Sequence, residues 1–185
     1  SDVYKRQAVS WSKRHSVNIV IVGGKDAWKT TDILAKNRIP VIYEGVTSIP
    51  MRRFEDYDQP YKTPNVLYES GVQFCISSFG YAGSTEQLRN LPYQASMAAS
   101  YGLPKDVALR AITLSVAEII GVDKQIGSLD PGKDATLFIS DGDPLEIRTN
   151  IIQAYIQGRE IDMKDRHKSL YSKFREKYRQ LDILK

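Results

Sequence analysis

The first half of the chain contains three short hydrophobic runs, at residues 17–22, 39–43 and 72–77. Each run is rich in β-branched or aromatic residues, and the first ends at the glycine pair Gly23-Gly24. The β-branched run at 17–22 is typical of a strand that is buried on both faces of a parallel sheet, and the runs at 39–43 and 72–77 are typical of further strands. We therefore predict three parallel strands at these positions.

Helical patterns occupy the spaces between these runs. Asp26 can cap a helix that continues to about Asn37, and Pro64 suits the first turn of a second helix, which ends at Gly71. A long polar connection, residues 44–62, precedes the second helix. The order strand, helix, strand, helix, strand predicts right-handed βαβ units.

The second half is predicted to begin with helices and to continue with strands. Pro104 opens a helix, and Ser115 with Glu118 has the spacing of a capping box that restarts it. Residues 151–157 are predicted to pair with the residues around Ile161 as a hairpin. The second half therefore predicts a helical layer followed by a small antiparallel unit.

The last predicted element is a basic amphipathic helix over residues 165–181. Its apolar positions, spaced three or four apart, are Leu170, Tyr171, Phe174, Tyr178 and Leu181. Residues 159–185 hold nine Lys or Arg and five Asp or Glu, which accounts for the net charge of +4. We expect this helix to pack onto its own chain, because burying such side chains is favourable. A helix that binds a partner or a membrane surface is the alternative.

The segment from Ile126 to Leu145 carries the most specific signal. Pro131 and Gly132 suit a type II turn, the next residues alternate as in a strand, and Pro144 ends the run. The segment resembles the GSL-x-x-GKDADL…DGDPL signature of the amidohydrolase superfamily, in particular its imidazolonepropionase-like branch. In that family the signature belongs to a small β-sandwich beside a TIM-barrel hydrolase.

The resemblance implies an α/β fold that comprises the C-terminal part of a TIM barrel (its last three βα units), part of a small β-sandwich and a C-terminal helix. A complete barrel takes roughly 250 residues, so these 185 residues are expected to be the C-terminal fragment of a longer enzyme. The expected organisation is a non-native or disordered leader at 1–10, the partial barrel at 11–122, the partial sandwich at 123–163 and the helix at 164–185.

Composition argues against several classes of function. The basic residues form no aromatic-rich stripe or helix-turn-helix pattern, so we expect no nucleic-acid partner. Cys75 is the only cysteine, which excludes an intrachain disulfide. The longest strongly apolar run, Ile19 to Val22, is too short to span a membrane.

The ends of the first and third strands bear on the chemistry. Metal-dependent members of the resembled family place a His at the end of strand six and an Asp at the end of strand eight. Gly23 and Ser78 stand at the matching positions, and His15 and His167 are predicted to be solvated elsewhere. We therefore expect no metal site in this chain alone. Zinc or a similar divalent ion in the full-length protein would take its ligands from the missing N-terminal part.

Five residues are candidates for binding substrate at the carboxyl ends of the strands: Gly23, Lys25, Glu44, Ser78 and Asn90. Functional groups of TIM barrels lie at these ends. We expect Gly23 and Ser78 to face a common cleft at the ends of adjacent strands. No catalytic residue is assigned.

The resemblance predicts a hydrolase that acts on C–N bonds of small-molecule amides other than peptides, cyclic amides included. The alternative is a metal-free, non-catalytic homologue that serves as a binding or assembly module, and Gly23 and Ser78 at the ligand positions favour it. A homo-oligomer is left open. The first and third strands should have unpaired edges, so we expect the isolated chain to associate.

Overall fold

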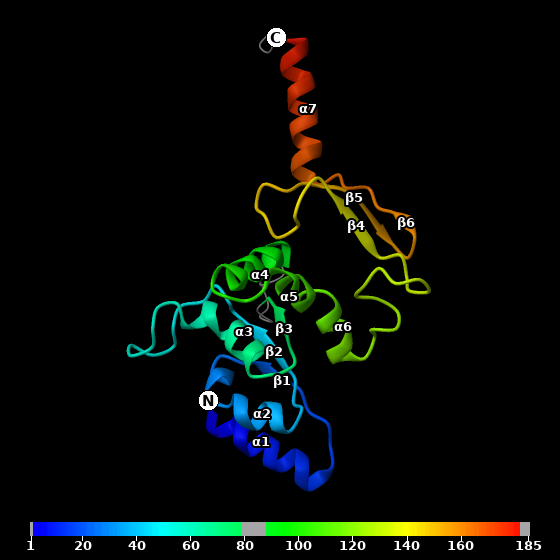
Figure 1. Ribbon diagram of the computed structural model, residues 1–185. Helices are drawn as coiled ribbons and strands as arrows, with labels where there is room; N and C mark the ends of the chain where they lie inside the picture. The colour runs from blue at the N-terminus through cyan, green and yellow to red at the C-terminus, as the bar shows by residue number, and fades with distance from the viewer. Residues whose placement is uncertain (1, 79–87, 182–185) are drawn as a thin grey trace.

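The computed structural model describes residues 2–78 and 88–181 (Figure 1). A parallel sheet with its helices, a separate antiparallel sheet and a final helix follow one another along the chain (Figure 1). The elements are α1 (Asp2–His15), β1 (Ile21–Gly23), the 3₁₀ turn η1 (Ala27–Lys29), α2 (Thr31–Lys36), β2 (Val41–Glu44), α3 (Gln59–Glu69), β3 (Phe74–Ser77), α4 (Leu91–Ser100), α5 (Lys105–Ala111), α6 (Leu114–Ile120), β4 (Leu137–Ser140), β5 (Ile151–Ile156), β6 (Arg159–Glu160) and α7 (Arg166–Gln180).

Strands β1, β2 and β3 form a parallel sheet in that order. Gly23 lies beside Tyr43, and Glu44 lies beside Ser77. The three predicted strands and their parallel arrangement are therefore confirmed. That this sheet is part of a TIM barrel, and that the second sheet is part of a β-sandwich, stay predictions.

The two faces of the parallel sheet differ in how well they are covered. Val41, Tyr43 and Ile76 share one face and are buried in the main hydrophobic core. On the other face, Ile42 is only half-buried and Val22 is 62% exposed. The prediction that the first strand is buried on both faces is wrong, because β1 is an edge strand and no described segment covers Val22.

Helix α3 depends on a contact from the sheet. It begins at Gln59 with Pro60 in its first turn, so the prediction that Pro64 opens the helix is wrong. Pro64 lies inside the helix, and because proline has no N–H, it cannot donate to the carbonyl of Pro60 four residues earlier. The hydroxyl of Tyr43 donates to that carbonyl at 2.9 Å. A strand residue thus supplies the hydrogen bond that the helix lacks.

Two predicted caps are also wrong. The helix predicted from Asp26 onward is divided into η1 and α2, and the Asp26 side chain makes no cap hydrogen bond but pairs with Arg52. Helix α6 begins after Thr113, and the hydroxyl of Ser115 accepts a hydrogen bond from Arg110. In both cases a charged donor competes successfully for the capping side chain, since charge-assisted hydrogen bonds are the stronger ones.

Helix α1 occupies the segment expected to be a non-native or disordered leader; the structure describes residues 2–10 as part of this helix, and a non-native origin stays a prediction. Val9 is buried in the main hydrophobic core, and Lys5 is buried beside it on the same helix. The helix packs against η1 and α2. This apolar contact holds an otherwise polar segment in place.

Strands β4, β5 and β6 form a separate antiparallel sheet. The predicted hairpin is confirmed, and its turn residues Gln157 and Gly158 both have positive φ, as in a type I′ turn. The connection between β4 and β5 returns to the helical layer. There Leu145 is 2% exposed in the main core, and Asp143 pairs with Lys105 of α5 at 2.6 Å.

Helix α7 extends away from both sheets (Figure 1). None of its residues is buried, and Phe174 is 46% exposed. The prediction that this helix packs onto its own chain is wrong for the described residues, because apolar spacing tells which side of a helix is apolar but not what lies against it. Its start is well defined, since the Asp165 carboxylate accepts the Lys168 N–H at 2.7 Å.

Candidate functional site

The carboxyl edge of the parallel sheet brings together three of the five predicted site residues. Gly23 ends β1, Glu44 ends β2, and Ser78 follows β3. Parallel strands in register end at the same edge, so these residues share it. β2 lies between β1 and β3, so the prediction that Gly23 and Ser78 end adjacent strands is wrong.

The register also separates two of these residues. Gly23 is paired with Tyr43, which neighbours Glu44 in the same strand. Successive residues of a strand point to opposite faces, so Gly23 and Glu44 belong to opposite faces of the sheet. Glu44 is half-buried on the face that carries Val22 and Ile42. The sheet therefore offers a carboxylate on its less covered face.

The two glycines at the end of β1, Gly23 and Gly24, have different structural roles. A Cβ on Gly24 would lie 2.7 Å from Cγ1 of Val41, so only glycine permits this close approach to β2. A Cβ on Gly23 would meet nothing within 4 Å. Both residues have positive φ, which glycine adopts without strain. Gly24 is required by packing, whereas Gly23 leaves open space at the carboxyl edge.

Ser78 is the most unusual polar group of this edge. The residue is 5% exposed, and its Oγ atom has no hydrogen-bond partner among the described residues. Leaving a buried hydroxyl unpaired costs about 1–3 kcal/mol. Among the described residues, this hydroxyl is therefore a buried polar group whose hydrogen-bonding capacity is not used.

The remaining two predicted residues lie beside this edge in the chain. Lys25 follows the glycine pair and is half-buried. Asn90 immediately precedes α4, at the N-cap position, although its side chain does not cap that helix. The binding of substrate by the five residues stays a prediction.

An ion-pair cluster that the sequence analysis missed fixes the connection after β2. We call it the Arg52 cluster; its members are Asp26, Lys29, Arg52 and Glu55. The Arg52 guanidinium donates to both carboxylate oxygens of Asp26, at 2.7 and 3.1 Å, and to Oε1 of Glu55 at 2.5 Å. Lys29 lies 3.5 Å from Glu55. The cluster joins residues 45–58 to the segment that follows β1.

The cluster also changes the acidity of its carboxyl groups. The hydrogen bond from Arg52 holds the pKa of Asp26 below its ordinary value. Burial alone would raise the pKa of Glu55, but hydrogen bonds from Arg52 and from the backbone N–H of Met51 bring it below its ordinary value. Both carboxyl groups are therefore charged at neutral pH. The spacings Asp26-x-x-Lys29 and Arg52-x-x-Glu55 indicate each half of this cluster in the sequence, but nothing local indicates that the two halves meet.

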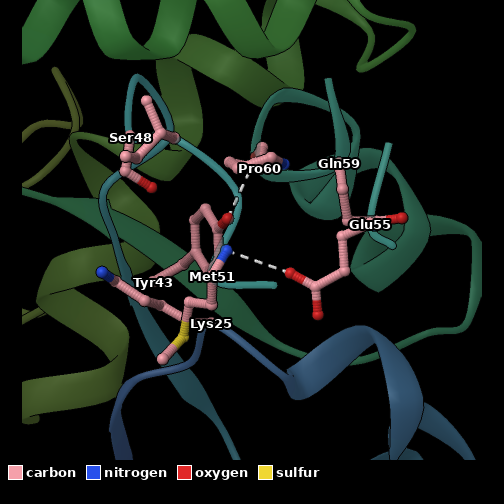
Figure 2. A pocket seen from close by; sticks show the side chains of 8 residues that line it. Lys25, Tyr43, Ser48, Met51, Glu55, Gln59 and Pro60 are labelled. Atoms are coloured by element: carbon pink, nitrogen blue, oxygen red, sulfur yellow. Dashed lines mark hydrogen bonds between the residues drawn. The ribbon is translucent and has the colours of Figure 1, made fainter. Parts of the chain in front are cut away.

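A small pocket lies between the end of β2 and this connection (Figure 2). It is lined by Lys25, Tyr43, Ser48, Ile49, Met51, Glu55, Gln59 and Pro60. The pocket has a volume of about 10 Å³, which is room for one water molecule and not for an amide substrate. Burial raises the pKa of Tyr43 to about 12, so its hydroxyl remains a donor to Pro60. Of the predicted residues, only Lys25 lines this pocket.

A divalent metal does not fit the described residues by themselves. No group of three or more His, Cys, Asp or Glu side chains that could hold an ion occurs in residues 2–78 and 88–181. His15 lies in α1 and His167 lies in α7, both away from the carboxyl edge. The prediction that this chain alone binds no divalent metal tightly stays a prediction. None of the described helices is long and apolar enough to cross a membrane.

Comparison with known proteins places this geometry in a family. Residues 64–164 match the model of the amidohydrolase family. The amidohydrolase tasK of Hapsidospora irregularis is 32% identical over 65 residues, which are 35% of this chain and 7% of that protein.

Solved structures have the same fold. An amidohydrolase from Thermotoga maritima MSB8 superposes with a TM-score of 0.73 at 27% identity, covering 85% of this chain and 40% of that one. A Xaa-Pro dipeptidase with methionine in its active site superposes with a TM-score of 0.63 at 18% identity, covering 84% of this chain and 42% of that one. The chain thus spans less than half the length of these relatives.

The family match covers more than half of the chain and includes the segment from Ile126 to Leu145 that carried the resemblance. The narrower resemblance, to the imidazolonepropionase-like branch, stays a prediction. The α/β fold and the match together lead to one conclusion: this chain belongs to the amidohydrolase family.

Proposed function

We propose that this chain is the C-terminal part of a longer hydrolase that cleaves C–N bonds of small-molecule amides, cyclic amides included. We place the substrate at the carboxyl edge of the β1–β2–β3 sheet. The observation that carries the proposal is that Glu44 ends β2 and Ser78 follows β3 at the same edge of an amidohydrolase-family chain, and that the Ser78 hydroxyl has no hydrogen-bond partner among the described residues. Ligands of α/β proteins bind at the carboxyl ends of parallel strands.

The proposal includes a partial TIM barrel followed by part of a β-sandwich. Two observations support it. On the sheet face that carries Val22, Ile42 and Cys75, Cys75 is buried but Val22 is 62% exposed, and parallel sheets are normally covered on both faces. The chain also spans 40% of the Thermotoga maritima amidohydrolase. The remaining barrel strands would then lie beside β1 and β3.

Each candidate residue has a chemical role in this proposal. Hydrolysis of an amide adds water to the carbonyl carbon and breaks the C–N bond, which gives a carboxylic acid and an amine. The Glu44 carboxylate would accept a hydrogen bond from an N–H group of the substrate. The Ser78 hydroxyl would donate a hydrogen bond to the carbonyl oxygen of the substrate. Lys25 and Asn90 would contact substrate at the rim, and Gly23 would leave room for it.

No step of this chemistry is assigned to a metal held by the described residues, because their donor set does not fit one. Zinc or a similar ion would require ligands from the rest of the longer polypeptide. A metal-free binding module remains the alternative outcome of the experiment below, and no comparison favours it.

The test is an amide-hydrolysis assay of the longer polypeptide, with the formation of new amino groups measured over a panel of linear and cyclic amides, since a cyclic amide opens without releasing a separate amine. Glu44→Gln should lower kcat/KM by about tenfold to a hundredfold, the effect of losing a hydrogen bond to a charged group. Glu69→Gln is the matched control, because Glu69 is exposed at the far end of α3, where its carboxylate accepts a hydrogen bond from Asn65.

Two results would count against the proposal. Amides that bind without forming any new amino group would support the metal-free binding module instead. Unchanged kinetics of Glu44→Gln on an amide that is hydrolysed would remove Glu44 from the substrate site.

A further inference from the structure

The exposed side chains of α7 are arranged in three zones around the helix. With 3.6 residues per turn, the apolar side chains of Leu170, Phe174 and Tyr178 fall on one side, together with Tyr171. The rings of Phe174 and Tyr178 stack with centroids 6.4 Å apart. This apolar strip runs most of the length of the helix.

Two rows of basic residues border the apolar strip. One row contains Arg166, Lys173 and Lys177, and the other contains Lys168, Arg175 and Arg179. Small or uncharged polar residues and Glu176 occupy the side opposite the strip, where Glu176 bonds Arg179 and Gln180. The helix therefore has six Lys or Arg and one acidic residue, and its cations lie along the borders of its apolar side.

Nothing in the described part of the chain covers the strip. No residue of α7 is buried, and the helix extends away from both sheets (Figure 1). The amidohydrolase-family match ends at residue 164, directly before the Asp165 cap. The family match therefore gives no role to this helix.

The charge pattern of α7 distinguishes between the possible binding partners of the apolar strip. A second copy of α7 would bring two basic rows against two basic rows, and the resulting repulsion opposes pairing. An anionic lipid surface complements both parts of the pattern, because apolar side chains enter the acyl boundary while flanking Lys and Arg reach the phosphate headgroups. We propose that α7 binds an anionic membrane surface, lying in its plane with the apolar strip inward.

This arrangement gives the helix an anchoring role. The apolar strip supplies affinity for the interface, and the basic rows supply selectivity for anionic lipid, an attraction that salt weakens. The proposal does not depend on the hydrolase activity proposed above.

The test is flotation of the 185-residue chain with vesicles of phosphatidylcholine and phosphatidylserine in equal parts. Flotation separates bound protein from aggregates, which sediment. The chain should float with these vesicles and not with phosphatidylcholine alone. Lys173→Glu should weaken binding about tenfold, since each cation near an anionic surface contributes measurably and the change reverses one. Phe174→Asp should abolish flotation.

Lys124→Glu is the matched control, because it makes the same change of charge at an exposed position outside α7 and should bind as the original chain does. Far-ultraviolet circular dichroism should stay the same in all variants, since α7 buries no residue.

Three outcomes would overturn the proposal. The first is equal flotation with neutral vesicles, and the second is undiminished flotation of Phe174→Asp. The third is vesicle binding by this chain that disappears in the longer polypeptide, which would mean that another protein segment covers the strip.

Discussion

Arg52 connects two carboxylates that lie far apart in the sequence. The Asp26 side chain is 5% exposed, and both of its oxygens accept hydrogen bonds from the guanidinium. Replacing Asp26 with Asn keeps the shape but removes the charge that makes these bonds strong. The arrangement at this one residue therefore predicts a measurable effect on folding.

We expect Asp26→Asn to lower the free energy of unfolding by about 1.5–3 kcal/mol, the loss typical of a hydrogen bond to a charged group. Urea denaturation of the chain measures it. Asp56→Asn is the control, because Asp56 is exposed in the same connection, and it should change stability little. Equal losses in the two variants would contradict the role given to the Arg52 cluster.

The pH dependence of stability follows from the same residue. The pKa of Asp26 is lower in the folded chain than its ordinary value, so the unfolded chain binds the extra proton as the solution becomes acidic. The stabilisation is complete above the ordinary pKa of about 3.9 and is lost as the pH falls through the lowered value of the folded state. Asp26→Asn should therefore flatten the acid side of the stability curve, whereas Asp56→Asn should leave its slope unchanged.

The sequence could not have indicated this arrangement. Asp26 follows a strand and precedes a helix-like segment, which is the local context of an N-cap. Its actual partner is 26 positions away in a connection without periodicity. Glycine roles are easier to predict, since Gly23-Gly24 marks a strand end by composition alone. Which of the two glycines is required by packing depends on Val41 in the neighbouring strand, which leaves no room for a Cβ on Gly24.

At the scale of elements, the connection between β4 and β5 holds the second sheet against the helices. Leu145 is buried in the main core, and Lys105 of α5 contacts both Asp143 and Glu146, at 2.6 and 3.1 Å. The apolar contact should dominate, because the ion pairs are exposed to solvent. Leu145 is thus the residue whose loss should loosen this connection.

Leu145→Ala should lower the free energy of unfolding by about 2–5 kcal/mol, the range for removing a fully buried leucine side chain. Chemical denaturation measures the loss. Ile147→Ala, two residues later and exposed, should change stability by less than about 0.5 kcal/mol. Similar effects at the two positions would show that the connection does not depend on Leu145.

Helices and strands could be predicted where neighbouring residues in the sequence determine them. The three parallel strands and the 151–161 hairpin are set by apolar runs and turn residues, and both were predicted. The start of α3 was not predicted, because Pro60 and Pro64 are equally acceptable in a first turn until the Tyr43 hydroxyl is known to serve the Pro60 carbonyl. The placement of α7 was not predicted either, since amphipathic spacing does not identify the surface that the helix contacts.

At the scale of the whole molecule, no described strand pairs with the outer edges of β1 and β3 in the parallel sheet. β1 and β3 are the outer strands, and Val22 of β1 is exposed. Edge strands with exposed apolar residues pair with other chains, and a lysine on such an edge prevents it. The isolated chain should therefore associate, as expected from its sequence.

We expect Val22→Lys to raise the monomer fraction of the isolated chain, measured by light scattering after gel filtration. Val17→Lys is the control, because Val17 is exposed before the strand begins and the change in charge is the same. A monodisperse monomer without any substitution would contradict the expectation. An equal benefit from both substitutions would assign the association to net charge instead of the strand edge.

The candidate site could be located from the sequence only in part. Strand ends place Gly23, Glu44 and Ser78 at one edge by the rules of parallel sheets. The cluster that fixes residues 45–58 depends on contacts between distant side chains, which one sequence does not reveal. Any ligands that the rest of a longer polypeptide supplies lie outside this sequence altogether.

The hydrogen bond from Tyr43 to the Pro60 carbonyl constrains the order in which this sequence can evolve. While Pro64 is present, a change of Tyr43 to Phe leaves a buried carbonyl without a donor. A change of Pro64 to Ala restores the helical N–H, after which the hydroxyl becomes dispensable. Mutational paths through this fold are therefore directional: the proline is replaced first, and homologues that combine proline at position 64 with phenylalanine at position 43 should be rare.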